Sequence, residues 1–113
     1  MIDLAKINDI AQRIANRFNP EQIILIGSYA KGTQDNGSDI DLLIIQDTDL
    51  PSHKRGIDIR LSLVGSKMPF DILVYTRNEF EKEKNDKYSF LHAAVKNSRI
   101  LYERPDWAYE TMA

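Results

Sequence analysis

Residues 23–45 read IILIGSYAKGTQDNGSDIDLLII, and this stretch decides the fold. It begins and ends with apolar runs rich in Ile and Leu, which are typical of buried strands. Between the runs, the pair Asn36-Gly37 is a strong turn signal, and residues 28–31 are expected to form a short helix. The stretch therefore predicts a strand over residues 23–26, a compact connector and a second strand over residues 39–45.

Helices and strands are expected on both sides of this stretch. Leu4 begins a series of apolar residues at helical spacing, with Asp3 as the expected N-cap and Asn19-Pro20 as the end of the helix. The alternation of segments indicates an α/β or α+β protein with a small sheet flanked by helices. The later segments are a helix over residues 52–64 (from the spacing of Ile57, Leu61 and Val64), a strand over 70–75, a helix from residue 76, a helix around Leu91 and an edge strand over 100–102.

Length and composition fit a single domain over residues 1–113, with a tail from about residue 104. The chain contains no cysteine, which excludes disulfides, thiolate zinc sites and cysteine nucleophiles. The net charge of −2 argues against dedicated binding of nucleic acid, which usually leaves a basic footprint. The sequence shows neither a signal peptide nor an apolar run long enough to span a membrane, so a cytoplasmic location is expected.

Three acidic residues are candidates for a metal site. Because side chains alternate along a strand, Asp39 and Asp41 are expected to share one face and to repel each other unless a cation lies between them. Such hard oxygen ligands favour Mg²⁺, with Mn²⁺ as the alternative. Asp71 lies inside a later apolar run, where an acid is costly unless it binds a metal or pairs with a cation such as Arg60. If the third strand neighbours the second, the three acids can hold two cations about 4 Å apart.

Small residues precede these acids at the end of the first strand. Gly27 lets the backbone approach a phosphate closely, and Ser28 offers a hydroxyl and an amide to it. A helix that begins here would direct its N-terminal amides at the same anion. Lys31 carries a positive charge that could screen a phosphate, although it also fits an ordinary surface lysine. A triphosphate beside the carboxylates is therefore the expected ligand.

Other candidates have simpler explanations. Asp47 and Asp49 form a second Asp-x-Asp, but they follow the strand in a Pro-containing loop and are interpreted as solvated. Tyr29 could stack on a base or pack in the core. Trp107 and Tyr109 in the tail either pin the tail to its own core or anchor a partner protein.

The motif resembles the signature of the minimal nucleotidyltransferase (MNT) family, in the superfamily of DNA polymerase beta. That signature is Gly-Ser, a spacer, Asp-x-Asp and a third Asp on a later strand. Gly27, Ser28, Asp39 and Asp41 match it, with ten residues between Ser28 and Asp39, and Asp71 lies where the third acid is expected. Many relatives have Arg where this chain has Lys31, which puts a bidentate phosphate contact in doubt.

The resemblance implies a nucleotidyltransferase fold and a function. Small members of the family are often encoded beside a HEPN-domain protein, as antitoxins of type VII-like toxin–antitoxin pairs. They transfer AMP from ATP to a tyrosine of the HEPN ribonuclease toxin and release pyrophosphate. The resemblance assigns two Mg²⁺ ions and catalysis to Asp39, Asp41 and Asp71, and nucleotide binding to Gly27, Ser28 and Lys31. The preference for ATP comes from the family alone.

Two alternatives remain open at this point. The chain could transfer a nucleotide to a small hydroxylated molecule such as an antibiotic, although relatives that do so usually carry an additional helical domain. It could also be a module that inhibits its partner by binding alone, with a degenerate site. The intact set of three acids argues against degeneracy.

Overall fold

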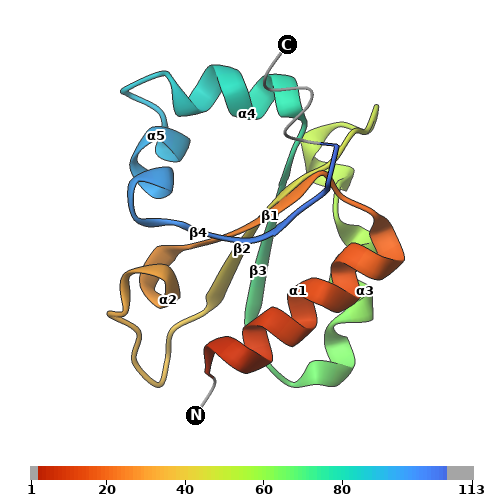
Figure 1. Ribbon diagram of the computed structural model, residues 1–113, viewed down its shortest axis with the longest axis vertical. Coiled ribbons are helices and arrows are strands. Elements are labelled where there is room, and N and C mark those ends of the chain that lie inside the picture. The colour runs from red at the N-terminus through yellow and green to blue at the C-terminus, as the bar shows by residue number, and fades with distance from the viewer. Residues whose placement is uncertain (1–2, 107–113) are drawn as a thin grey trace.

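The computed structural model describes residues 3–106, in which four strands form one sheet in the order β3-β2-β1-β4 (Figure 1). The central strand β1 is antiparallel to β2 and β4, whereas β2 and β3 are parallel. This mixed sheet with helices on both faces confirms the predicted α/β (α+β) class. The strands are β1 (Gln22–Ile26), β2 (Ile40–Ile45), β3 (Phe70–Tyr75) and β4 (Arg99–Glu103).

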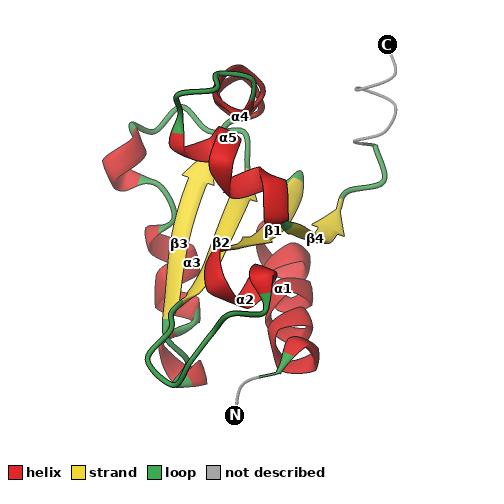
Figure 2. Cartoon of the chain, turned by 90° about the vertical axis from the view of Figure 1, so that its left-hand side faces the viewer, coloured by secondary structure: helices red, strands yellow, loops and turns green. Residues whose placement is uncertain are grey.

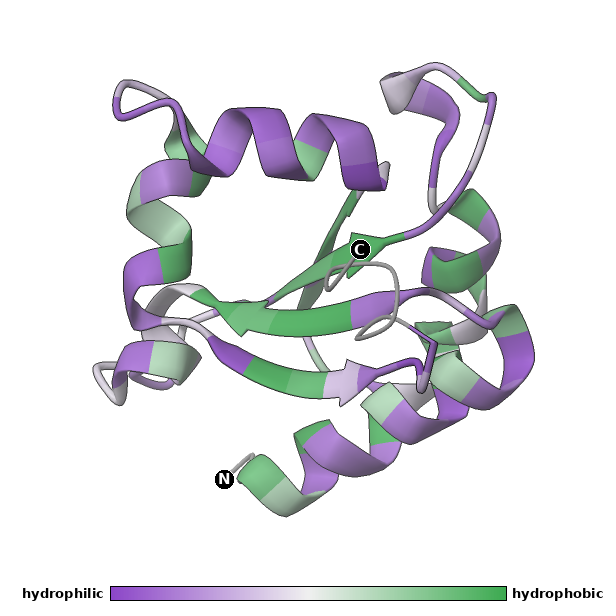
Figure 3. Cartoon of the chain, turned by 45° about the horizontal axis from the view of Figure 1, so that its top comes forward, coloured by the Kyte–Doolittle hydropathy of each residue, from purple (hydrophilic) through white to green (hydrophobic). Residues whose placement is uncertain are grey.

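Helices cover both faces of the sheet. One face packs against α1 (Leu4–Phe18) and α3 (Ile57–Ser62), and the other lies under α4 (Arg77–Lys84) and α5 (Phe90–Ala94) (Figure 1). The strands are largely hydrophobic, whereas α4 is hydrophilic apart from one turn (Figure 3). That turn carries Phe80, the buried residue of α4. Between residues 3 and 106, no helix is long and apolar enough to cross a membrane.

The first helix forms as its sequence predicts. Asp3 caps it by accepting a hydrogen bond from the backbone N–H of Lys6 at 2.9 Å, and Asn19 ends it in the left-handed conformation, with φ of 49°. Its buried stripe is Ile7, Ile10, Ala11, Ile14 and Ala15. Each fully buried isoleucine contributes about 1.5–3 kcal/mol, so the stripe attaches α1 firmly to the sheet.

The continuous helix predicted over residues 52–64 is wrong. Gly56 adopts φ of +76°, a left-handed conformation that interrupts any helix and starts a new one after it. The restarted helix turns Ile59 and Leu63 into the core. The segment is therefore split into η1 (Ser52–Lys54), α3 and η2 (Val64–Ser66). The three apolar residues whose spacing predicted the helix are exposed: Ile57 at 51%, Leu61 at 68% and Val64 at 73%.

The C-terminal elements follow the prediction more closely. Thr76 and Glu79 form a reciprocal capping box at the start of α4. The helix predicted around Leu91 is α5, which buries Leu91 and continues into η3 (Val95–Asn97). The edge strand is β4, which pairs with β1 alone in the described sheet. Trp107 and Tyr109 lie outside the described residues.

Candidate functional site

Two of the three predicted acids are direct neighbours in the sheet. The parallel register of β2 and β3 places Asp41 opposite Asp71, and adjacent strands lie about 4.8 Å apart. Two residues further along each strand, Leu43 and Leu73 pack in the core under α4 and α5. Because side chains alternate, both carboxylates point to that same face of the sheet.

Asp39 lies immediately before β2 and two residues from Asp41. The connector that leads to it is closed by a small hydrogen-bond network. Ser38 Oγ accepts the backbone N–H of Asp35 at 2.9 Å, and Oδ1 of Asp35 accepts the backbone N–H of Gly37 at 2.9 Å. Sequence reasoning missed the roles of Asp35 and Ser38, although an Asp two residues before a turn Gly is a recognisable signal.

Two features require a glycine at position 27: its left-handed backbone conformation and the close approach of the Asp41 carboxylate. Its φ is +74°, and a β carbon built on it would lie 2.2 Å from Oδ2 of Asp41. The register explains this contact, because Ile26, the last residue of β1, pairs with Asp41. Gly27 and Asp41 therefore pack against each other, and the carboxylate fills the space that a side chain at residue 27 would take.

The electrostatics of the site favour a bound cation. The pKa of Asp41 is raised by burial, then by the charge of Asp71 and then by the charge of Asp39. Asp41 thus feels the negative charge of both other carboxylates, and a divalent cation beside it would offset that repulsion. Within residues 3–106, no group of three His, Cys, Asp or Glu side chains is placed to hold a metal ion, so Asp39, Asp41 and Asp71 do not form a ready three-carboxylate site. The donor set still fits Mg²⁺, which typically uses one or two carboxylates together with substrate phosphates.

The proposed phosphate-binding residues follow the end of β1 that pairs with Asp41. The short helix α2 (Gly27–Lys31) packs on β1 and β2 and lies in front of the strands together with α5 (Figure 2). Ser28 is half-buried in its first turn, and Lys31 is exposed at its end. Tyr29 is only 9% exposed and belongs to the core, which agrees with the packing alternative.

Asp71 does not pair with Arg60. The guanidinium of Arg60 instead donates to the backbone carbonyl of Ile72 at 2.6 Å and to that of Arg55 at 3.1 Å. Arg55 similarly donates to the carbonyl of Val74. Both arginines therefore cover the free edge of β3, where unpaired carbonyls would otherwise invite another strand, and Asp71 stays available.

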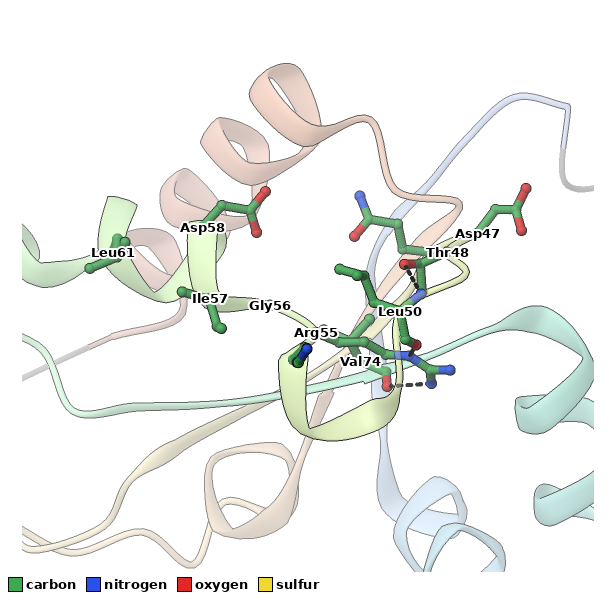
Figure 4. Close-up of a pocket in the computed structure, with 11 residues that line it drawn as sticks. Asp47, Thr48, Leu50, Arg55, Gly56, Ile57, Asp58, Leu61 and Val74 are labelled. Carbon is green, nitrogen blue, oxygen red and sulfur yellow. Dashed lines mark hydrogen bonds between the residues drawn. The ribbon is translucent and has the colours of Figure 1, made fainter.

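The second Asp-x-Asp lies at the opposite end of β2 from Asp41. Asp47 and Asp49 are exposed in the loop that follows β2, as interpreted from the sequence. Asp47 lines a pocket of about 410 Å³ between this loop and α3, together with Leu50 and Ile57 (Figure 4). Asp58 of α3 also lines this pocket, but it and Asp47 come from a helix and a loop and are not paired on neighbouring strands as Asp41 and Asp71 are.

Comparisons with known proteins agree with this fold. Residues 5–106 match the family described as "Nucleotidyltransferase domain". A search of curated proteins returned no match. A crystal structure of a toxin–antitoxin with AMP-PNP superposes with a TM-score of 0.61 at 19% identity, covering 93% of this chain and 83% of that chain. A protein from Sulfolobus solfataricus assigned to the nucleotidyltransferases superposes with a TM-score of 0.52 at 21% identity, covering 87% and 78%. At these identities the two structures show the shared fold.

Proposed function

Because the chain belongs to the nucleotidyltransferase domain family, we propose that it transfers AMP from ATP to a hydroxyl group of a partner protein. Nucleotidyl transfer is the reaction of the family. The single observation that supports the proposal most is the register of β2 and β3, which sets Asp41 beside Asp71. The raised pKa of Asp41 supports it further, because both neighbouring acids contribute to that shift.

We assign a role to each residue of the motif. Asp39 and Asp41 hold the divalent cations, which supply positive charge to the triphosphate when bound. Gly27 and Ser28 face the phosphates with backbone amides and a hydroxyl, and Lys31 adds a charge nearby. Asp71 completes the carboxylate set and accepts the proton of the incoming hydroxyl. That oxygen then forms a bond to the α-phosphorus, the bond from this phosphorus to the bridging oxygen breaks, and pyrophosphate leaves.

The proposed partner is a HEPN-domain ribonuclease toxin, and the proposed acceptor is one of its tyrosines. The resemblance of the Gly-Ser and Asp-x-Asp motif to MNT antitoxins supports this choice. The structural neighbour bound to AMP-PNP is itself a toxin–antitoxin protein, which is consistent with a nucleotide-dependent antitoxin on this fold. The chain would then neutralise its toxin by covalent modification, in a type VII-like system, as a single domain with Mg²⁺ as cofactor.

Intact mass spectrometry of the partner tests the proposal. The protein is incubated with Mg-ATP and the HEPN protein encoded by a neighbouring reading frame, and the partner is expected to gain the mass of one or more AMP units. The variant with both Asp39→Asn and Asp41→Asn is the control and should leave the partner unmodified. An unmodified partner after incubation with the folded wild-type protein would refute the proposal.

The same control separates chemistry from binding. If the doubly substituted variant still neutralises the toxin in full, the chain acts by occlusion and the three acids are not needed for function. If a small hydroxylated compound is adenylated without any protein partner, the acceptor assignment is wrong while nucleotidyl transfer stands.

A further inference from the structure

The outer surface of α3 carries an apolar stripe. Ile57, Leu61 and Val64 recur at helical spacing, which places them on one side of the segment formed by α3 and η2. All three are more than half exposed, whereas Ile59 of the same helix is buried. Leu50, in the loop after β2, is 49% exposed and lines the pocket beside α3 together with Ile57 and Leu61 (Figure 4). These four exposed side chains form one apolar surface, which we call the α3 patch.

The exposure of the α3 patch follows from the phase of the helix. The left-handed backbone of Gly56 starts α3 so that Ile59 faces the core and the stripe faces outward. Between residues 3 and 106, eight large apolar side chains are exposed, and the patch holds four of them. Single exposed apolar residues are ordinary, but a contiguous patch is typical of a binding surface. The patch therefore calls for a partner that covers it.

The pocket at one end of the α3 patch has an acidic rim. Asp47 on the loop and Asp58 on α3 both line it and are exposed. Neither carboxylate forms an ion pair within the described part of the chain. Two cations also line the pocket, but Arg55 is neutralised by Glu79 through contacts of 2.6 and 3.1 Å, which leaves Lys54. The rim is therefore left with a net negative charge.

We propose that the α3 patch docks an amphipathic helix of the acceptor protein, with apolar residues along one side and Lys or Arg near one end. The inference rests on the proposed function, which requires a protein to be held by this chain. The helical spacing of the patch suits a helix laid along α3, and a basic end would meet Asp47 and Asp58. A second copy of this chain fits less well, because a two-fold interface uses the same surface twice and would set the acidic rim against itself.

The position of the α3 patch relative to the acids suits this role. The stripe ends in η2, which leads through residues 67–69 into β3, and the second residue of β3 is Asp71. In Figure 2, this connection and the connector between α2 and β2 lie at the same end of the sheet. The buried side of α3 packs on the face opposite to the carboxylates. A protein docked on the patch would thus lie beside the edge strand that carries Asp71 without covering the site.

A charge placed on the patch tests the docking. Leu61→Lys changes a residue that is 68% exposed, so the circular dichroism spectrum and the Tm shift with Mg²⁺ and a non-transferable ATP analogue should be retained. Its affinity for the HEPN protein encoded by the neighbouring reading frame, measured by isothermal titration calorimetry without nucleotide, should fall by about tenfold or more. Affinity equal to that of the wild type, or no complex with the wild type itself, would overturn the inference.

Two further variants locate the contact and its charge. Ile100→Lys is the matched control, because Ile100 is a 59% exposed apolar residue of β4, at the other edge of the sheet, and it should bind the HEPN protein as the wild type does. Asp58→Lys should weaken binding at low salt and less at high salt, since salt screens exposed charges. Equal losses in Leu61→Lys and Ile100→Lys, or full affinity of Asp58→Lys at low salt, would contradict the proposed surface or its charge.

Two readouts separate this inference from the proposed function and from self-association. If wild type and Leu61→Lys add AMP to a limiting amount of the HEPN protein at the same rate, the docking surface is wrong while nucleotidyl transfer stands. If the patch variants lose binding but the wild type adds no AMP, the transfer is wrong while the docking stands. In sedimentation experiments the protein alone should be monomeric. A dimer that Leu61→Lys dissociates would assign the patch to a second copy and contradict the inference.

Discussion

At the scale of single residues, Gly27 and Asp41 of the motif pack directly against each other. Gly27→Ala should place a β carbon against the carboxylate of Asp41 as well as strain a backbone at φ of +74°. Gly32 is a matched control, since its φ is +77° but nothing lies within 4 Å of an added β carbon. Both alanine variants should lose about 1–2 kcal/mol of stability from the left-handed backbone, measured by urea unfolding. Only Gly27→Ala should also abolish pyrophosphate release, and equal activity in the two variants would contradict the packing argument.

Asp41 also makes the stability of the fold depend on pH. Its folded-state pKa lies above the ordinary value of 3.8, so the folded protein binds this proton more tightly than the unfolded chain does. The stability contributed by Asp41 is therefore highest at low pH and falls as the pH rises through the raised pKa. Asp41→Asn should be more stable than the wild type at pH 7 without Mg²⁺, as measured by urea unfolding, and the difference should shrink at low pH. A variant less stable than the wild type at pH 7 would show that the neighbouring acids do not strain the site.

At the scale of elements, the divided segment after β2 depends on Gly56. An added β carbon there would lie 3.0 Å from Cγ2 of Val74, and φ is +76°. Gly56→Ala should therefore lower the free energy of unfolding by about 1–2 kcal/mol from the backbone alone, with crowding against β3 in addition. Gly65→Ala is the control, because no atom lies within 4 Å of its added β carbon and its φ is not positive. Urea unfolding measures both variants, and equal stability losses would mean that Gly56 is not the reason the helix restarts.

At the scale of the whole molecule, local sequence patterns predicted the strands and the helix caps well. The arrangement of the strands in the sheet depended on long-range pairing. The spacing of residues 23–45 predicted both strands and the place of Asp41 in the second, whereas Asp39 lies just before β2. The neighbourhood of Asp71 depended on β3 lying parallel to β2, which no local pattern encodes. The spacing of apolar residues after residue 52 led to a wrong prediction of one continuous helix. Gly56 is left-handed and starts a new helix, which buries Ile59 and leaves Ile57 exposed.

The three acids, scattered over two strands and a loop, should act as one unit in ligand binding. A ligand that binds only the folded state stabilises it by about 2.7 kcal/mol when its free concentration is about 100 times the Kd. A non-transferable ATP analogue should therefore raise the Tm of the wild-type protein in the presence of Mg²⁺ and much less after chelation of the metal. Asp39→Asn should lose the Mg²⁺-dependent part of this shift, because the cation loses one of its ligands. Asp47→Asn, in the exposed loop at the other end of β2, should retain the full shift. Loss of the shift in Asp47→Asn with retention in Asp39→Asn would move the nucleotide site to the opposite end of the sheet.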